Sequence, residues 1–254
     1  MNDWSELTLF IYITARMSGC VLFNPLLSRN GVPNLFRGGL VLVLSVLVFS
    51  GAGRGVAVPV GVAELAVRIL LELGVGFCLG MVVNFFFYIP QLAGFSVDTQ
   101  MGLTMNQIYD AGTQSNMSVT GTLLNALMML LFFAANGHHT LLRVFLTSGD
   151  VVSYGAVRLG PEVADAMLAL FAQCTLLAVK LAMPILAAEL LGQVGMGILM
   201  KVIPQINVFV INIDLKVIIG LLLLLFLLSP ISEYLRMAEE EMLDSLKEIL
   251  ALTG

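Results

Sequence analysis

Six long apolar segments recur along the chain, separated by polar passages of very different lengths. They run from Leu7 to Phe23, Gly39 to Phe49, Leu65 to Ile89, Val119 to Ala135, Ala166 to Leu191 and Val208 to Leu228. A helix that crosses the hydrocarbon core of a bilayer needs about 20 residues at ~1.5 Å of rise each. The second segment is shorter than this and the third is longer, so the pattern favours a packed assembly of helices over a regular bundle of spans.

Two polar breaks interrupt the apolar pattern, Gly94–Ser118 and Gly197–Phe209. The second reads GILMKVIPQINVF and places a lysine, a proline and two amides between two apolar segments. Broken helix at membrane depth persists only where protein or an aqueous cavity covers it, because hydrocarbon cannot satisfy the freed backbone groups. The first break is far longer than a helix hairpin needs, and its methionines and Tyr109 indicate a functional loop rather than disorder.

From Ser229 to Gly254 the pattern changes to that of an amphipathic helix. Leucines and methionines recur at helical spacing, opposite acidic side chains that include Glu239. A mostly acidic helix is poorly suited to an anionic membrane surface. We therefore expect this helix to lie outside the hydrocarbon and to bind a partner protein.

Composition places the chain among polytopic membrane proteins. Of its 254 residues, 59% are hydrophobic and 11% are charged, and the mean hydropathy is +0.98. The few basic residues are scattered and the formal net charge is −5, which excludes a nucleic-acid partner. The first apolar segment lacks a preceding basic region and a cleavage site, so we expect it to remain in the mature protein.

Ionisable residues inside the apolar segments form the first group of candidate functional residues. They are Arg16, Arg68, Glu72, Lys180, Glu189, Asp214 and Lys216. Such groups are costly inside a membrane, and each needs a partner or water. Arg68 and Glu72 are four residues apart and can pair on one helix face. For Arg16, Lys180 and Asp214 no partner exists at that spacing, which predicts contacts between helices or with another subunit.

A GxxxG pattern, Gly76 to Gly80, lies within the third apolar segment. Small residues at this spacing allow two helices to approach each other closely. The pattern predicts a tight helix crossing at these glycines.

The sequence carries no motif typical of catalysis or metal binding. Its two histidines, His138 and His139, are adjacent, so their side chains are expected to diverge on a helix rather than to converge on one metal. No GxSxG, HExxH, Walker or GxGxxG pattern is present. We therefore expect no cofactor, no metal ion and no enzymatic activity.

Taken together, these residues resemble the FliR/SctT family, the R-type subunit of the export gate in bacterial flagellar and type III secretion systems. The resemblance covers essentially the whole chain. It runs from Arg16, Gly19 and Asn24–Pro25 through Gln100–Leu103 and Asn136–His138 to its sharpest part, Lys201–Phe209. Each piece alone is unspecific, whereas their order and spacing are specific.

The resemblance implies an all-α protein of membrane-associated helical hairpins. A P-like first part, residues 1–160, would be fused to a Q-like C-terminal hairpin, residues 161–254, which ends in the amphipathic helix. One R-type copy would join the P-type and Q-type subunits in a helical ring around the export channel, with the B-type switch protein and the A-type export protein as further partners. Secreted proteins would be the substrates, and the inner membrane at the flagellar basal body would be the location.

The resemblance also implies a role for the first polar break, which is similar to a plug loop that fills the closed channel. The residues implied in the plug are Met105, Asn106, Ile108, Tyr109, Asp110, Ala111 and Gly112. Tyr109 and the methionines would form a deformable apolar seal. Asp98, Asn106 and Asp110 would meet water beside it. The alternative is an ordinary surface loop.

The second break is similar to a turn that faces the other subunits of the gate. Its implied contact residues are Lys201, Pro204, Gln205, Asn207 and Phe209. Gln205 and Asn207 would satisfy the backbone groups that Pro204 leaves free, because an amide side chain both donates and accepts hydrogen bonds. The alternative is a solvent-facing loop between two helices.

The sequence leaves three function classes open. The leading one is a channel-forming subunit of the flagellar type III protein export gate. A virulence-type injectisome gate would use the same residues, and general likeness favours the flagellar system. A small-molecule secondary transporter would also use broken helices and midplane charges, but it would show corresponding breaks in two halves of the chain, and the two breaks here share no pattern.

Overall fold

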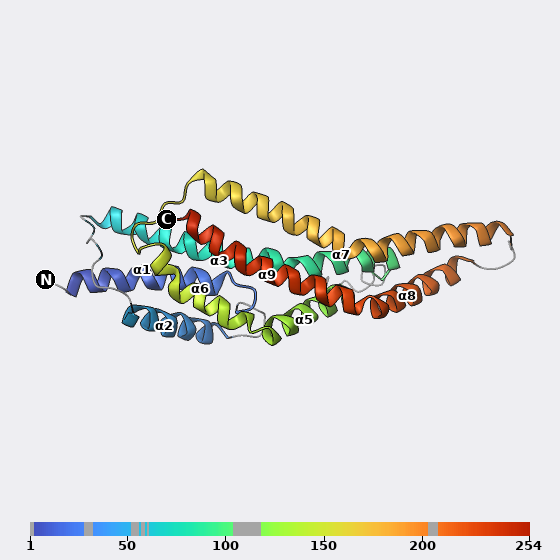
Figure 1. Ribbon diagram of the computed structural model, residues 1–254, viewed down its shortest axis with the longest axis horizontal. Helices are drawn as coiled ribbons and strands as arrows, with labels where there is room; N and C mark the ends of the chain where they lie inside the picture. The colour runs from blue at the N-terminus through green and yellow to red at the C-terminus, as the bar shows by residue number, and fades with distance from the viewer. Residues whose placement is uncertain are drawn as a thin grey trace. The chain divides into compact units, whose positions relative to one another are not determined.

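The computed structural model is all-helical in the parts of the chain it describes (Figure 1). These parts are residues 3–27, 33–51, 56, 59, 61–103, 118–202 and 208–254, with the backbone alone for residues 3, 200 and 208–214. Eight helices follow one another within them. They are α1 (Asp3–Leu22), α2 (Asn34–Gly51), α3 (Val62–Met101), α5 (Val119–Ala134), α6 (Gly137–Val151), α7 (Pro161–Val202), α8 (Val208–Phe226) and α9 (Leu228–Leu252).

Several of these helices have the length and composition of membrane spans. Within the described residues, α2, α3 and the part of α7 up to Leu199 are each long and apolar enough to cross a bilayer. Two pairs of helices are bent at a short break: α5 with α6, and the second half of α8 with α9. If each pair makes one span, the number of candidate spans rises from 3 to 5. The expectation of an all-α, membrane-associated protein is confirmed.

Helices α2 and α6 differ from what the apolar pattern predicted. Helix α2 extends the short Gly39–Phe49 run at both ends, which brings it to the length of a span. The pattern did not predict α6, because polar residues are scattered through its sequence. Its buried face, which includes Leu141, Phe145 and Ser148, nevertheless recurs at helical spacing.

The first polar break is shorter than the sequence predicted. Helix α3 continues through Gly94 to its last residue, Met101, and the following Gly102 adopts a positive φ of 82°. The hydroxyl side chains of this stretch, Ser96 and Thr99, are compatible with a helix because they bond to the backbone of their own helix. The Thr99 hydroxyl, for example, donates to the carbonyl oxygen of Phe95 at 2.8 Å.

The second polar break is also shorter. Helix α7 continues to Val202 and α8 begins at Val208, so that residues 203–207 alone separate the two helices. Nothing in the sequence from Gly197 to Val202 prevents helix formation, since the proline of the predicted break comes after this stretch, at position 204.

The helices pack into two compact units. Unit 1 comprises Met1–Phe86, Asn136–Ala172 and Glu239–Gly254, and unit 2 comprises Phe87–Ala135 and Gln173–Ala238. In unit 1, α2 packs against α1 and α6 (Figure 1). The division into a P-like part, residues 1–160, and a Q-like part, residues 161–254, stays a prediction. Pro161, where the second part would begin, is the first residue of α7.

The C-terminal helix α9 confirms the predicted amphipathic pattern with one exception. Leu235, Met242 and Leu246 are fully buried, as the apolar stripe requires. Glu239 was expected on the polar face, but it is only 3% exposed. It lies four residues after Leu235 and three before Met242, and therefore on the same stripe. Its Oε1 atom has no hydrogen-bond partner within the described part of the chain.

Candidate functional site

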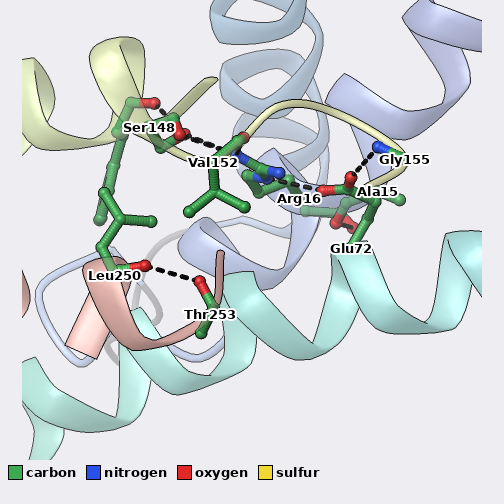
Figure 2. A network of polar contacts seen from close by, with 10 residues as sticks. Ala15, Arg16, Glu72, Ser148, Val152, Gly155, Leu250 and Thr253 are labelled. Atoms are coloured by element: carbon green, nitrogen blue, oxygen red, sulfur yellow. Dashed lines mark hydrogen bonds and ion pairs between the residues drawn. The ribbon is translucent and has the colours of Figure 1, made fainter. Parts of the chain in front are cut away.

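Arg16 of α1 is the centre of a buried polar network in unit 1 (Figure 2). Its side chain is fully buried, and its Nε donates to Oε2 of Glu72 at 2.6 Å. Its Nη1 donates to the carbonyl oxygens of Ser148 and Val152, each at 3.0 Å. Both carbonyls belong to the C-terminal end of α6, where a positive charge satisfies unpaired acceptors and opposes the negative end of the helix dipole.

The loop after α6 completes this network. The backbone N–H of Gly155 donates to Oε1 of Glu72 at 2.7 Å, and the Arg16 guanidinium carbon lies 4.3 Å from the centroid of the Tyr154 ring. Burial raises the pKa of Tyr154, so the ring stays neutral beside the cation. We refer to these residues as the Arg16 network: Arg16, Glu72, Ser148, Val152, Tyr154 and Gly155.

The pairing predicted for Arg68 with Glu72 is wrong. Arg68 pairs with Glu64, one turn earlier on α3. Glu72 is not available to Arg68 because its carboxylate is buried against Arg16 and Gly155. The prediction that Arg16 finds a partner on another helix is confirmed.

Close approach of α1 and α3 positions the ion pair. A Cβ atom added to Gly19 would lie 2.6 Å from the carbonyl oxygen of Leu73, and one added to Gly76 would overlap the backbone of α1. A Cβ atom on Gly80 would lie 2.8 Å from the Cβ of Phe23. The tight crossing predicted from the GxxxG pattern is therefore confirmed, and its partner helix is α1.

A second buried polar cluster lies in unit 2, at the two ends of the first polar break. Asp98 of α3 is fully buried and accepts hydrogen bonds from the Ser118 hydroxyl at 2.7 Å and from the Thr120 N–H at 3.1 Å. Ser118 is the N-cap of α5, and its Oγ accepts from the Gly121 N–H at 2.8 Å. We refer to Asp98, Ser118 and Thr120 as the loop-base clamp.

A second pair of glycines brings the parts of the clamp together. A Cβ atom on Gly94 of α3 would overlap the backbone of Gly121 of α5, so the two helices cross in direct backbone contact. The prediction that Asp98 meets water is wrong, because its carboxylate caps the N-terminus of α5, where a negative charge is favourable. The clamp thereby ties position 98 to position 118 across the break.

Most residues predicted for the plug and for the second turn lie outside the described residues. They are Met105, Asn106, Ile108, Tyr109, Asp110, Ala111, Gly112, Pro204, Gln205 and Asn207. Of the predicted turn, Lys201 is exposed near the end of α7, and Phe209 lies near the start of α8. Their predicted roles stay predictions.

The remaining interior charges belong to α7 and α8. Glu189 is 1% exposed, and its Oε1 has no hydrogen-bond partner within the described part of unit 2. Lys216 is partly buried on α8. Lys180 is exposed on α7, and Asp214 is placed within α8 by its backbone.

The two histidines do not diverge as the sequence predicted. The ring centroids of His138 and His139 are 4.1 Å apart. Both residues stand on the first turn of α6, where no preceding turn restricts their rotamers, so the rings can lie against each other.

Sequence reasoning missed several members of both clusters. Ser118 directly precedes an apolar run, which is the usual signal of an N-cap and could have identified it. No local signal links Arg16 to Ser148, because 132 positions separate them along the chain.

Known proteins resemble this chain along nearly its whole length. Residues 7–242 match the family described as bacterial export proteins, family 1. The chain is similar to the flagellar biosynthetic protein FliR of Bacillus subtilis (strain 168), with 25% identity over 252 residues, which is 96% of this chain and 95% of that protein. It is also similar to FliR of Aquifex aeolicus (strain VF5), with 30% identity over 79% of this chain and 78% of that protein. The Yop proteins translocation protein T of Yersinia pestis is 29% identical over 85% of this chain and 84% of that protein.

Proposed function

Because this chain belongs to the bacterial export proteins of family 1, which it matches over residues 7–242, we propose that it is a channel-forming subunit of the flagellar type III protein export gate. It is a membrane protein, a homologue of the FliR proteins and a non-enzymatic component of the export apparatus. One copy per gate would pass unfolded flagellar substrates across the inner membrane. Its neighbours would be the P-type and Q-type subunits, with the B-type switch protein and the A-type export protein as further partners.

The observation that carries the proposal is the loop-base clamp. A loop that plugs a channel must be held at its base, so that its tip returns to the same place after each passage of substrate. The buried Asp98 carboxylate accepts hydrogen bonds from Ser118 and Thr120 on the far side of the predicted plug. Hydrogen bonds to a buried charged group are among the stronger ones in proteins. The clamp therefore supports an anchored plug between residues 103 and 118.

Deletion of Ile108–Asn116 tests the plug. We expect the deleted chain to assemble with the other gate subunits and to make the membrane leaky to ions, measured as conductance of the purified gate in a planar bilayer. The matched control is the same deletion expressed without the other subunits, which should form no conducting complex. An assembled gate with the deletion and unchanged conductance would contradict the proposal.

An injectisome gate is the second candidate, because the similarity to the Yersinia pestis translocation protein covers 85% of this chain at 29% identity. Complementation separates the two systems. We expect the chain to restore swimming to a flagellated host that lacks its own FliR and to leave protein secretion absent in a host that lacks its injectisome counterpart. Restored secretion without restored swimming would favour the injectisome.

A further inference from the structure

Lys180 interrupts an exposed apolar face of α7. It is the one charged residue in the sequence between Asp165 and Glu189. Leu176, Val179 and Met183 flank it at helical spacing and are 53%, 47% and 53% exposed. Lys180 itself is exposed, and no hydrogen bond or ion pair reaches it from the described residues. We refer to Leu176, Val179, Lys180 and Met183 as the Lys180 face.

Packing within unit 2 holds this face outward. The opposite side of α7, which includes Ala178, Leu181 and Ile185, is buried. The Tyr234 hydroxyl of α9 also donates to the carbonyl oxygen of Leu177 at 3.1 Å. Helix α7 therefore cannot turn Lys180 inward without exposing its buried stripe.

Lipid is a poor neighbour for the Lys180 face. The residue lies within the candidate span Pro161–Leu199, about 22 Å along the helix from Asp165 at ~1.5 Å per residue. A charged side chain at this depth needs a partner or water, and intramembrane lysines accordingly pair with other groups. The described residues around Lys180 are apolar and offer it no partner, which favours a partner on another protein.

We propose that the Lys180 face is an interface with an apolar transmembrane helix of another protein, and that this helix presents a carboxylate to Lys180. The apolar side chains fit a membrane helix, and the lysine selects one that carries an aspartate or glutamate at matching depth. The inference rests on the proposed function in one respect: it identifies the partner as another subunit of the export apparatus.

The three candidate spans of a second copy would be poor partners for the Lys180 face. Beyond the first two turns of the three candidate spans, the acidic residues are Glu72, Asp98 and Glu189. All three are buried. A second copy would therefore offer Lys180 no exposed carboxylate from these spans.

Charge variants in the full chain, expressed with the other subunits of its apparatus, test the interface. We expect Lys180→Glu to lower the yield of intact complex in mild detergent by about ten-fold or more. Lys180→Arg should retain the yield, and Lys180→Met should lie between them. The matched control is Glu162→Lys, which reverses an exposed charge in the first turn of the same helix, outside the Lys180 face. It should leave the yield unchanged. Full yield with Lys180→Glu would overturn the proposal.

Photo-crosslinking keeps the test decisive if a charge variant fails to accumulate. A benzophenone amino acid at Leu176 or Met183, with Lys180 unchanged, should crosslink to a helix of another apparatus protein that contains an aspartate or glutamate. Exchange of that acidic residue for lysine should restore the yield of Lys180→Glu. A crosslink to a second copy, crosslinks to lipid alone, or labelling of Lys180→Cys by a membrane-impermeant maleimide in the assembled complex would each overturn the interface.

The two proposals can fail separately. If the plug deletion leaves conductance unchanged while the crosslink forms, the channel role falls and the Lys180 interface stands. If the deletion makes the gate leak while no crosslink forms and Lys180→Glu assembles normally, the interface falls and the channel role stands.

Discussion

Arg16 and Glu72, 56 positions apart in the sequence, form an ion pair in which neither side chain is exposed. The carbonyl oxygens of Ser148 and Val152 accept two further hydrogen bonds from the guanidinium, and the N–H of Gly155 donates one to the carboxylate. A buried ion pair is tolerated only when such additional hydrogen bonds satisfy it. The pair therefore holds α1, α3 and the C-terminal end of α6 in one arrangement.

Removal of one charge from this pair should be strongly destabilising. We expect Glu72→Gln to lower the free energy of unfolding by about 3–5 kcal/mol, because it leaves the Arg16 cation buried without a counter-ion. The Arg16→Met/Glu72→Gln double variant should lose less than the sum of the two single variants. Thermal unfolding in mild detergent measures both.

The exposed pair Lys247–Asp244 provides the control for this measurement. Asp244→Asn should cost about 0–1 kcal/mol, since water screens an exposed pair. A similar loss for Glu72→Gln and Asp244→Asn would show that burial of the first pair has no energetic consequence.

Two glycine-to-alanine changes should have opposite effects on stability. Gly76→Ala places a methyl group on the backbone of α1 and should destabilise the chain by about 1–3 kcal/mol or more, because α1 and α3 must separate. Gly39→Ala on α2 meets nothing within 4 Å and should stabilise the helix by up to ~1 kcal/mol. Unfolding curves of both variants check this, and a neutral Gly76→Ala would contradict the tight crossing.

Loss of the loop-base clamp should make the assembled gate leak. Asp98→Ala leaves the Ser118 hydroxyl and the Thr120 N–H without their acceptor, so we expect a higher ion conductance in planar bilayers and normal assembly. Thr99→Ala is the adjacent control, since the Thr99 hydroxyl bonds to the carbonyl of Phe95 on its own helix. Equal conductance in the two variants would show that the clamp does not hold the plug in place.

Glu239 should be a destabilising residue in the isolated chain. Its carboxylate is buried on the apolar stripe of α9, and one of its oxygens lacks a hydrogen-bond partner within the described residues. Glu239→Leu should therefore raise the free energy of unfolding by about 1–3 kcal/mol, the usual cost of a buried unsatisfied polar group. Glu248→Leu changes an exposed position of the same helix and should leave stability unchanged. A lower melting temperature for Glu239→Leu would contradict this reasoning.

Helix boundaries show where prediction from the sequence failed. The stretch from Gly94 to Met101 resembles a loop because it contains serine, aspartate and threonine. In the fold, Ser96 and Thr99 donate to carbonyl oxygens of their own helix, and Asp98 accepts from the start of α5. Helix α6 was missed for a related reason, since its polar residues conceal a buried face that includes Leu141 and Phe145. Polarity alone does not distinguish a loop from a helix whose polar groups find partners in the fold.

The sequence by itself determined the class of this protein. Its long apolar segments can be satisfied only by helices in a membrane, and its ordered motifs are sufficient to identify the export family. Local patterns also determined the helix crossing at Gly76 and the apolar stripe of α9, because both depend on spacing within one helix. Only the tertiary structure decided the partners of the buried charges. Arg16 bonds to Glu72 and to the end of α6, and Asp98 bonds to the start of α5, because helices distant in sequence bring those groups within hydrogen-bonding distance.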